Sequence, residues 1–265
     1  MPVLTIPPAY EEALSSLQDS APPIPFDAVR DVIGNELSRD PAEAYAYVGE
    51  EPIAVASIGQ VHAARLFDGR EIVVKVRRPG IIPTVESDLA ILRVMAKLAI
   101  FGRRRSVVLG FIDEFAMTLR TELDYVAEGD SADRIRPGLM AIGVHVPIVI
   151  WELTTSGVLS LERIRGTKIT DFALLEEMGV DRRAVARDLA YAYLKMVFTN
   201  GFFHADPHPG NLFVEADGHL AMVDFGMMGT VTASVRAALV EILLGPGHEG
   251  LNAEFRGTQS SRGRP

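Results

Sequence analysis

The chain contains 265 residues, of which 48% are hydrophobic, and it carries a formal net charge of -9 at pH 7. This length and composition suffice for one two-lobed unit with a substantial core. The acidic balance argues against a nucleic-acid partner, because contacts to phosphate backbones require clustered Lys and Arg. The sequence has no cysteine, which excludes disulfides, thiolate catalysis and cysteine metal sites and fits a cytoplasmic location.

A small sheet is predicted in the first part of the chain. Residues 1–26 are expected to form a helix and a stiff connector, Pro22-Pro23-Ile24-Pro25, which leads into a second helix from Asp27 to Leu37. Three apolar segments follow, with Asp68-Gly69 as a two-residue turn between the last two. The expected strands are Ile53–Ile58, Gln60–Leu66 and Glu71–Val76.

Lys75 lies on the third expected strand, in the place of an ATP-binding lysine in kinase-type sites. The alternative is an edge-strand lysine whose stem packs on the sheet while its ammonium reaches water. The motif at Asp206 described below favours the first interpretation.

The most apolar stretch, Leu89 to Phe101, is shorter than the ~18 uncharged residues that a membrane-spanning helix needs. We expect a buried helix whose Arg93 and Lys97 reach solvent, followed by a linking loop with Arg103-Arg104-Arg105. The alternative is a helix that lies on an anionic membrane surface, which would make the protein peripheral to the membrane.

Several acids follow a helical pattern of apolar residues that predicts a helix from Leu109 to Glu128. On a regular helix Glu122 and Glu128, six residues apart, point about 240° away from each other and need different partners. A solvated acidic face is the common outcome for such a cluster. Lys75 favours an ion pair for one of them.

Asp206, Asn211 and Asp224 show the spacing of a kinase-type site. Asp206 is expected to accept a proton from a hydroxyl or to orient a water. Asn211 and Asp224 offer the oxygen ligands that Mg²⁺ prefers, and a triphosphate would supply others. Each motif alone would fit a turn or a capped loop equally well. Expected strands Leu212–Val214 and Leu220–Val223, with a two-residue turn at Asp217-Gly218, would bring the metal-binding pair together.

These residues together resemble the UbiB family of atypical protein-kinase-like proteins, linked to ubiquinone biosynthesis and called ADCK proteins in eukaryotes. The resemblance runs from about Leu14 to about Gly229. Glu122-Leu123-Asp124 matches the family's Glu-x-Asp motif, and the resemblance implies that Glu128 pairs with Lys75. The stretch from Val158 to Gly166 resembles the hinge between lobes, where adenine meets the backbone.

The family replaces the glycine-rich loop of kinases by an alanine-rich loop, matched here by Ala54-Val55-Ala56-Ser57, with Val55 departing from the usual small residue. The resemblance therefore implies a set of nucleotide-binding residues. This set is Ala54, Val55, Ala56, Ser57, Lys75, Glu122, Asp124, Glu162 and Ile164.

The sequence departs from the family at both ends. We find no match for the family's Lys-x-Gly-Gln motif, whose lysine contacts the first acid of Glu-x-Asp, here Glu122. Residues 246–265 are polar and expected to be disordered. The expected fold is α+β and protein-kinase-like, with a small β-containing lobe at 27–161 and a truncated, mainly helical lobe at 162–245.

The sequence thus predicts an atypical kinase or ATPase that binds Mg²⁺ with ATP or ADP and acts on a lipid, a quinone-pathway substrate or a protein. One alternative is a catalytically weak nucleotide-binding or interaction module of the same family. The other is a small-molecule phosphotransferase of the aminoglycoside type, which the alanine-rich loop and Glu-x-Asp disfavour. A peptide kinase is disfavoured because no Ala-Pro-Glu follows Asp224.

Overall fold

The computed structural model describes residues 22–100 and 103–244, and this part of the chain divides into two compact units. Of the described residues, unit 1 contains those up to Arg134 together with Val146–Arg165 and Val223–Met227. Unit 2 contains Ile135–His145, Gly166–Met222 and the described residues from Met228 to Leu244. The two units thus alternate along the sequence, whereas contiguous lobes were expected. The segments expected at 1–21 and 246–265 lie outside the described residues.

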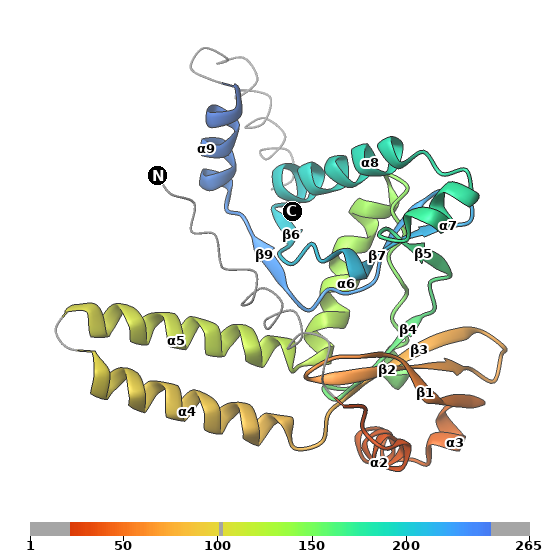
Figure 1. Ribbon diagram of the computed structural model, residues 1–265, viewed down its shortest axis with the longest axis horizontal. Helices are drawn as coiled ribbons and strands as arrows, with labels where there is room; N and C mark the ends of the chain where they lie inside the picture. The colour runs from red at the N-terminus through yellow and green to blue at the C-terminus, as the bar shows by residue number, and fades with distance from the viewer. Residues whose placement is uncertain (1–21, 101–102, 245–265) are drawn as a thin grey trace, which may run out of the picture. The chain divides into compact units, whose positions relative to one another are not determined.

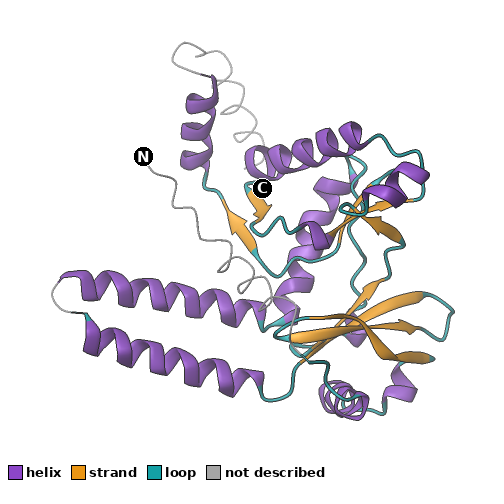
Figure 2. Ribbon diagram, in the orientation of Figure 1, coloured by secondary structure: helices purple, strands orange, loops and turns teal. Residues whose placement is uncertain are grey.

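A four-stranded antiparallel sheet forms the centre of unit 1 and has the order β1-β2-β3-β4. The strands are β1 (Tyr47–Val55), β2 (Gly59–Arg65), β3 (Glu71–Arg77) and β4 (Val158–Glu162). β1 begins six residues before the expected strand, and its pairing with β2 is irregular around Pro52, where a ladder hydrogen bond cannot be donated. Figure 2 shows these strands in orange.

One face of this sheet carries the core of unit 1. Ile72, Val74 and Val76 alternate along β3 and pack with Val29 and Ile33 of helix α2 (Phe26–Leu37) in one buried cluster. Because successive side chains on a strand point to opposite faces, Lys75 faces away from this cluster. The short helices α3 (Pro41–Ala44) and η1 (Trp151–Leu153) complete the connections of the sheet.

Helices α4 (Ile81–Ala99) and α5 (Arg103–Glu122) form a long antiparallel hairpin within unit 1 (Figure 1). The expected burial of the 89–101 stretch is wrong: of its described residues only Leu89 and Ala96 are buried, while Ile91 and Leu98 are exposed. A two-helix hairpin buries only its seam, which explains the difference. Along the described chain, no helix combines the length and apolar character needed to cross a membrane.

Two details of the hairpin also differ from expectation. Arg103, Arg104 and Arg105 begin α5 and do not form a linking loop. Arg93 does not simply reach solvent, because its guanidinium donates to Asp113 Oδ1 across the hairpin at 2.9 and 3.0 Å.

The single helix expected from Leu109 to Glu128 is instead two helices. α5 ends at Glu122, and α6 runs from Tyr125 to Met140. Asp124 Oδ1 accepts a hydrogen bond from Val126 N at 3.1 Å, which caps the start of the second helix. The angle of about 240° between Glu122 and Glu128 therefore does not apply.

Unit 2 combines helices with two small antiparallel sheets, of order β5-β7-β8 and β6-β9. Buried Val214, Leu220 and Met222 on β7 and β8 contribute to its core, together with Ala192 and Met196. Its strands are β5 (Gly166–Lys168), β6 (Phe202–His204), β7 (Leu212–Glu215), β8 (Leu220–Met222) and β9 (Met228–Thr230). Its helices are α7 (Phe172–Glu177), α8 (Arg182–Leu194), η2 (Lys195–Asn200), η3 (Pro209–Asn211) and α9 (Ala233–Leu244).

The two hairpin turns contain three residues where two were expected. Leu66 N donates to Arg70 O and Glu215 N donates to His219 O, so each pair closes a loop of three residues. The third loop residue is Gly69 with φ +90° or Gly218 with φ +87°, the left-handed position that such loops require. Asp68 and Asp217 each accept a hydrogen bond from the backbone two residues on.

Candidate functional site

A buried ion pair between Lys75 and Glu128 is the centre of the site in unit 1. Lys75 Nζ lies 3.0 Å from Glu128 Oε1 and 2.7 Å from Oε2. The Glu128 side chain is only 4% exposed and that of Lys75 only 16%. The pairing that the family resemblance implied is therefore present, and the roles of both residues toward a nucleotide stay predictions.

Asp224 and Tyr125 complete the surroundings of the lysine. Asp224 Oδ2 lies 3.7 Å from Lys75 Nζ, and the ammonium stands 5.0 Å from the centre of the Tyr125 ring. Burial by itself lowers the pKa of Lys75, but the charges of Glu128 and Asp224 outweigh it, so the pKa rises and the ammonium stays charged. Burial raises the pKa of Glu128, and the charge of Lys75 opposes that rise.

Arg77 fixes the start of the helix that carries Glu128. It lies two residues after Lys75 on β3, and its Nη1 donates to the carbonyls of Leu123 and Ser156 at 2.7 and 2.6 Å. Its other terminal nitrogen, Nη2, lies 3.3 Å from Glu36 Oε1 on α2. The junction between α5 and α6 is thus held by the strand that carries the lysine.

Three carboxylate side chains meet around Gly226. A Cβ at this residue would lie 3.4 Å from Asp224 Oδ1, 3.9 Å from Glu122 Cγ and 3.9 Å from Glu128 Oε2. Gly226 N also donates to Asp224 Oδ1 at 3.0 Å, which fixes that carboxylate. The residue after Phe225 thus brings the side chains of Asp224, Glu122 and Glu128 close to one backbone position.

Asp224 keeps access to solvent, with 37% of its side chain exposed. Within the described residues, no group of three or more His, Cys, Asp or Glu side chains could hold a metal ion by itself. The Asp224 carboxylate can therefore be reached by a ligand from solvent.

The other nucleotide-binding residues expected in unit 1 lie at two ends of the sheet. Ala54–Ser57 are exposed at the end of β1 and in the turn to β2, where Ala56 N donates to Gly59 O at 2.8 Å. Glu162 ends β4, and its Oε2 accepts a hydrogen bond from Ile148 N at 3.1 Å. Ile164 follows in the segment between β4 and β5, and Asp124 is the helix cap described above.

Asp206 and Asn211 belong to unit 2, where they flank a short turn. Asp206 N donates to His204 Nδ1 at 3.2 Å, so the buried His204 fixes the start of the loop. Asn211 N donates to His208 O at 3.0 Å, and Asn211 directly precedes β7. Burial raises the pKa of the neighbouring Tyr193 to about 12, and the charge of Asp206 adds to this effect.

Sequence reasoning missed Tyr125 and Arg77. Tyr125 is fully buried, and its hydroxyl has no hydrogen-bond partner among the described residues. A side chain at Gly59 would collide with this hydroxyl and with Val76 O, which requires a glycine at the start of β2. The adjacency of Tyr125 to Asp124 was the only signal, and Arg77 had none beyond its position two residues after Lys75.

A sequence profile described as the ABC1 atypical kinase-like domain matches residues 16–248 of the chain. An uncharacterised protein of Synechocystis is 40% identical over 90% of this chain and 42% of its own length. The chloroplastic protein Activity of bc1 complex kinase 8 of Arabidopsis thaliana is 38% identical over 91% of this chain and 32% of its length. The probable protein kinase UbiB of Marinobacter nauticus is 36% identical over 90% of this chain and 45% of its length.

The chain therefore spans less than half the length of these three relatives. Among solved structures, that of Rv3197 with erythromycin from Mycobacterium tuberculosis has a TM-score of 0.62 and 28% identity. The likeness covers 84% of this chain and 56% of that one. The fold is thus of the α+β, kinase-like class that the sequence predicts.

Proposed function

The chain belongs to the family of ABC1 atypical kinase-like domains, and from this premise we propose that it binds ATP with Mg²⁺ and transfers or hydrolyses the terminal phosphoryl group. The observation that carries the proposal is the buried Lys75–Glu128 pair beside the half-exposed Asp224. A charged lysine held by one buried carboxylate, next to a second carboxylate open to solvent, suits a phosphate group and its metal ion.

Each residue has a distinct role in this proposal. Lys75 binds phosphate oxygens and Glu128 keeps its ammonium in place. Asp224 and Asn211 hold Mg²⁺, which neutralises the charge on the phosphates when bound. Asp206 accepts the proton of an incoming hydroxyl or orients a water. Ala54–Ser57 cover the phosphates, and the backbone around Glu162 and Ile164 receives the adenine.

A titration of ATP and ADP with and without magnesium tests the proposal. Asp224→Asn should lose the magnesium-dependent part of binding, about tenfold or more in Kd, which equals ~1.4 kcal/mol. Asp31→Asn, an exposed position on α2, is the matched control and should bind like the wild type. Equal magnesium dependence in the wild type and Asp224→Asn would refute the metal assignment.

A nucleotide-binding or interaction module without turnover is the second candidate. Steady-state hydrolysis with Asp206→Asn separates the two: an enzyme loses turnover and keeps its affinity for nucleotide, because Asp206 acts on the nucleophile. If the wild type binds nucleotide but hydrolyses it no faster than Asp206→Asn does, the module is favoured.

The acceptor belongs to the same proposal, and the family resemblance supports a quinone-pathway or other isoprenoid-lipid substrate. A bacterium that lacks its own relative, supplied with the wild-type chain or with Asp206→Asn, provides the test. Restored quinone content with the wild type alone supports the assignment, and unchanged quinone content in all strains opposes it.

A further inference from the structure

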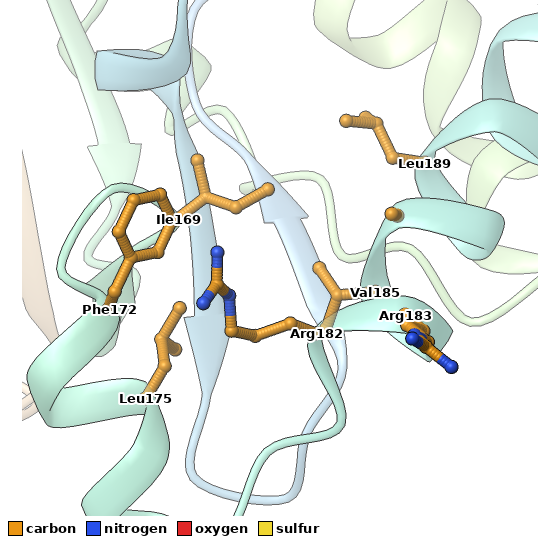
Figure 3. Close-up of a pocket in the computed structure, with 8 residues that line it drawn as sticks. Ile169, Phe172, Leu175, Arg182, Arg183, Val185 and Leu189 are labelled. Carbon is orange, nitrogen blue, oxygen red and sulfur yellow. The ribbon is translucent and has the colours of Figure 1, made fainter.

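A largely apolar pocket of about 520 Å³ lies within unit 2, and none of the residues that line it is assigned above to the nucleotide. This volume falls in the range of small-molecule sites. Figure 3 shows its walls: Ile169 and α7 on one side and the first turns of α8 on the other. The apolar lining is Ile169, Phe172, Leu175, Val185, Ala186 and Leu189.

Arg182 gives this pocket a positively charged group. Its guanidinium stacks on the Phe172 ring, with Cζ 4.0 Å from the ring centre. Arg183 also lines the pocket, but in Figure 3 its guanidinium points away from the other labelled side chains. No acidic residue lines the pocket, and no described carboxylate forms an ion pair with Arg182.

The nearest acids along the chain are engaged elsewhere. Asp171 accepts a hydrogen bond from Leu174 N at 3.2 Å and caps α7, while Asp181 accepts one from Arg183 N at 2.9 Å and caps α8. Stacking occupies the face of a guanidinium and leaves its in-plane N–H donors available. Arg182 can therefore receive an anion at the edge of this open, largely apolar pocket.

We propose that this pocket binds a small amphipathic anion, with an apolar chain against Leu175, Val185 and Leu189 and a terminal carboxylate or phosphate on Arg182. The site is independent of the proposed nucleotide chemistry. An Arg–carboxylate or Arg–phosphate contact gives orientation, and the apolar wall gives most of the buried area.

Calorimetric titrations with laurate, dodecyl phosphate and dodecanol, each below its aggregation limit, test the proposal. At least one of the two anions should bind, and dodecanol should bind at least about tenfold more weakly. Arg182→Ala should weaken anion binding by a similar factor. Arg187→Ala is the matched control, since this exposed arginine of α8 pairs with Asp188 and does not line the pocket. Binding of laurate alone identifies a carboxylate head, and binding of dodecyl phosphate alone a phosphate head.

Ala186→Trp provides a second variant that fills the pocket and leaves Arg182 in place. With its circular dichroism spectrum unchanged, this variant should bind neither anion. The proposal is overturned if the wild type binds neither anion, or if dodecanol binds as tightly as the anions. Equal affinities for Arg182→Ala and Arg187→Ala, or wild-type affinity in folded Ala186→Trp, would also overturn it.

Discussion

Lys75 and Glu128 depend on each other because neither has enough contact with water to be solvated alone. The lysine stays charged through Glu128 and Asp224, and the carboxylate of Glu128 accepts both of the short hydrogen bonds from Nζ. Removal of one partner of a buried ion pair leaves a buried charge, which costs about 3–5 kcal/mol. The pair therefore supports the fold of unit 1 as well as the proposed chemistry.

A double-mutant cycle with Lys75→Ala and Glu128→Ala measures this dependence. Each single variant should weaken nucleotide binding by a similar factor and lower the free energy of unfolding in urea. The double variant should lose clearly less than the sum of the two, because the first change already breaks the pair. Additive losses in both measurements would show that the two residues act separately.

His62 is a buried imidazole on β2 that is held neutral. Its Nδ1 lies 2.7 Å from Gly49 O and its Nε2 lies 2.8 Å from Gln60 Nε2. The backbone of Ile24 fixes the Gln60 amide from both sides, since Ile24 N donates to Oε1 and Ile24 O accepts from Nε2. Nε2 of His62 must then accept the hydrogen bond from Gln60 Nε2. A second proton on the imidazole would face this donor.

Acid should therefore destabilise unit 1 through His62. Burial lowers its pKa below 6.5, and the carbonyl of Gly49 and the charge of Glu51 oppose this only in part. The unfolded chain takes up the proton first, so the stabilisation is complete above about pH 6.5 and declines as the pH falls towards the lower pKa of the folded protein. Unfolding free energies at pH 7.5 and 5.5 should fall less in His62→Gln than in the wild type. An equal loss in His62→Gln and in the wild type would contradict the assignment.

At the residue scale, local motifs were enough to select Lys75, Asp206, Asn211 and Asp224 as candidates, because the proposed chemistry depends on residue type and spacing, and their roles stay predictions. Tyr125 could not be identified, since its importance comes from contacts with Lys75 and Gly59, which are distant in sequence. No local pattern encodes such contacts.

The turns and helices show where a side chain or a backbone angle decides an element. Both Asp-Gly turns were located correctly, but their loop length depends on strand register, which the turn residues alone do not determine. The break between α5 and α6 was missed because the recurrence of apolar residues reaches Leu123 without interruption. The side chain of Asp124, which caps the start of α6, separates the two helices.

Alanine substitution at two glycines of unit 1 should change the free energy of unfolding in opposite directions. A Cβ at Gly69 or at Gly110 would meet nothing within 4 Å, so only the backbone conformation matters. Gly69 has φ +90°, and Gly69→Ala should destabilise by about 1–2 kcal/mol. Gly110 lies inside α5, and Gly110→Ala should stabilise by about 0.5–1 kcal/mol. Urea denaturation of both variants checks this, and a shift of the same sign in both would contradict it.

At the scale of the whole molecule, the kinase-like fold class could be predicted from the order of three features along the chain. These are the expected strands, the acidic residues and the residues expected to bind a metal ion. The alternation of the two units could not be predicted. It arises because β4, at residues 158–162, pairs with β3 and places Leu159 opposite Lys75, and because Asp224 returns to the same lysine. Contacts between segments so far apart in the sequence are decided by side-chain packing in the folded protein.

The division into two compact units predicts that each unit can be followed by its own signal during unfolding. Trp151, the single tryptophan, belongs to unit 1, and its indole donates to Asp133 Oδ2 at 2.7 Å. Ile72→Ala in the core of unit 1 should cost about 2–5 kcal/mol and lower the midpoint of the tryptophan fluorescence transition. Leu220→Ala in unit 2 should lower the midpoint seen by circular dichroism and leave the fluorescence midpoint nearly unchanged. Equal shifts of both signals in both variants would show one cooperative transition.

The anchoring of the α5–α6 junction by Arg77 has an evolutionary consequence. The position of Glu128 is determined by β3 and by the cap at Asp124, and both lie outside the α4–α5 hairpin. Apart from Glu122, which ends α5 near Gly226, the hairpin contributes no residue to the candidate site in unit 1. Sequence change on its exposed apolar faces is therefore expected to leave the carboxylate that faces Lys75 in place, so these faces can diverge separately from the site.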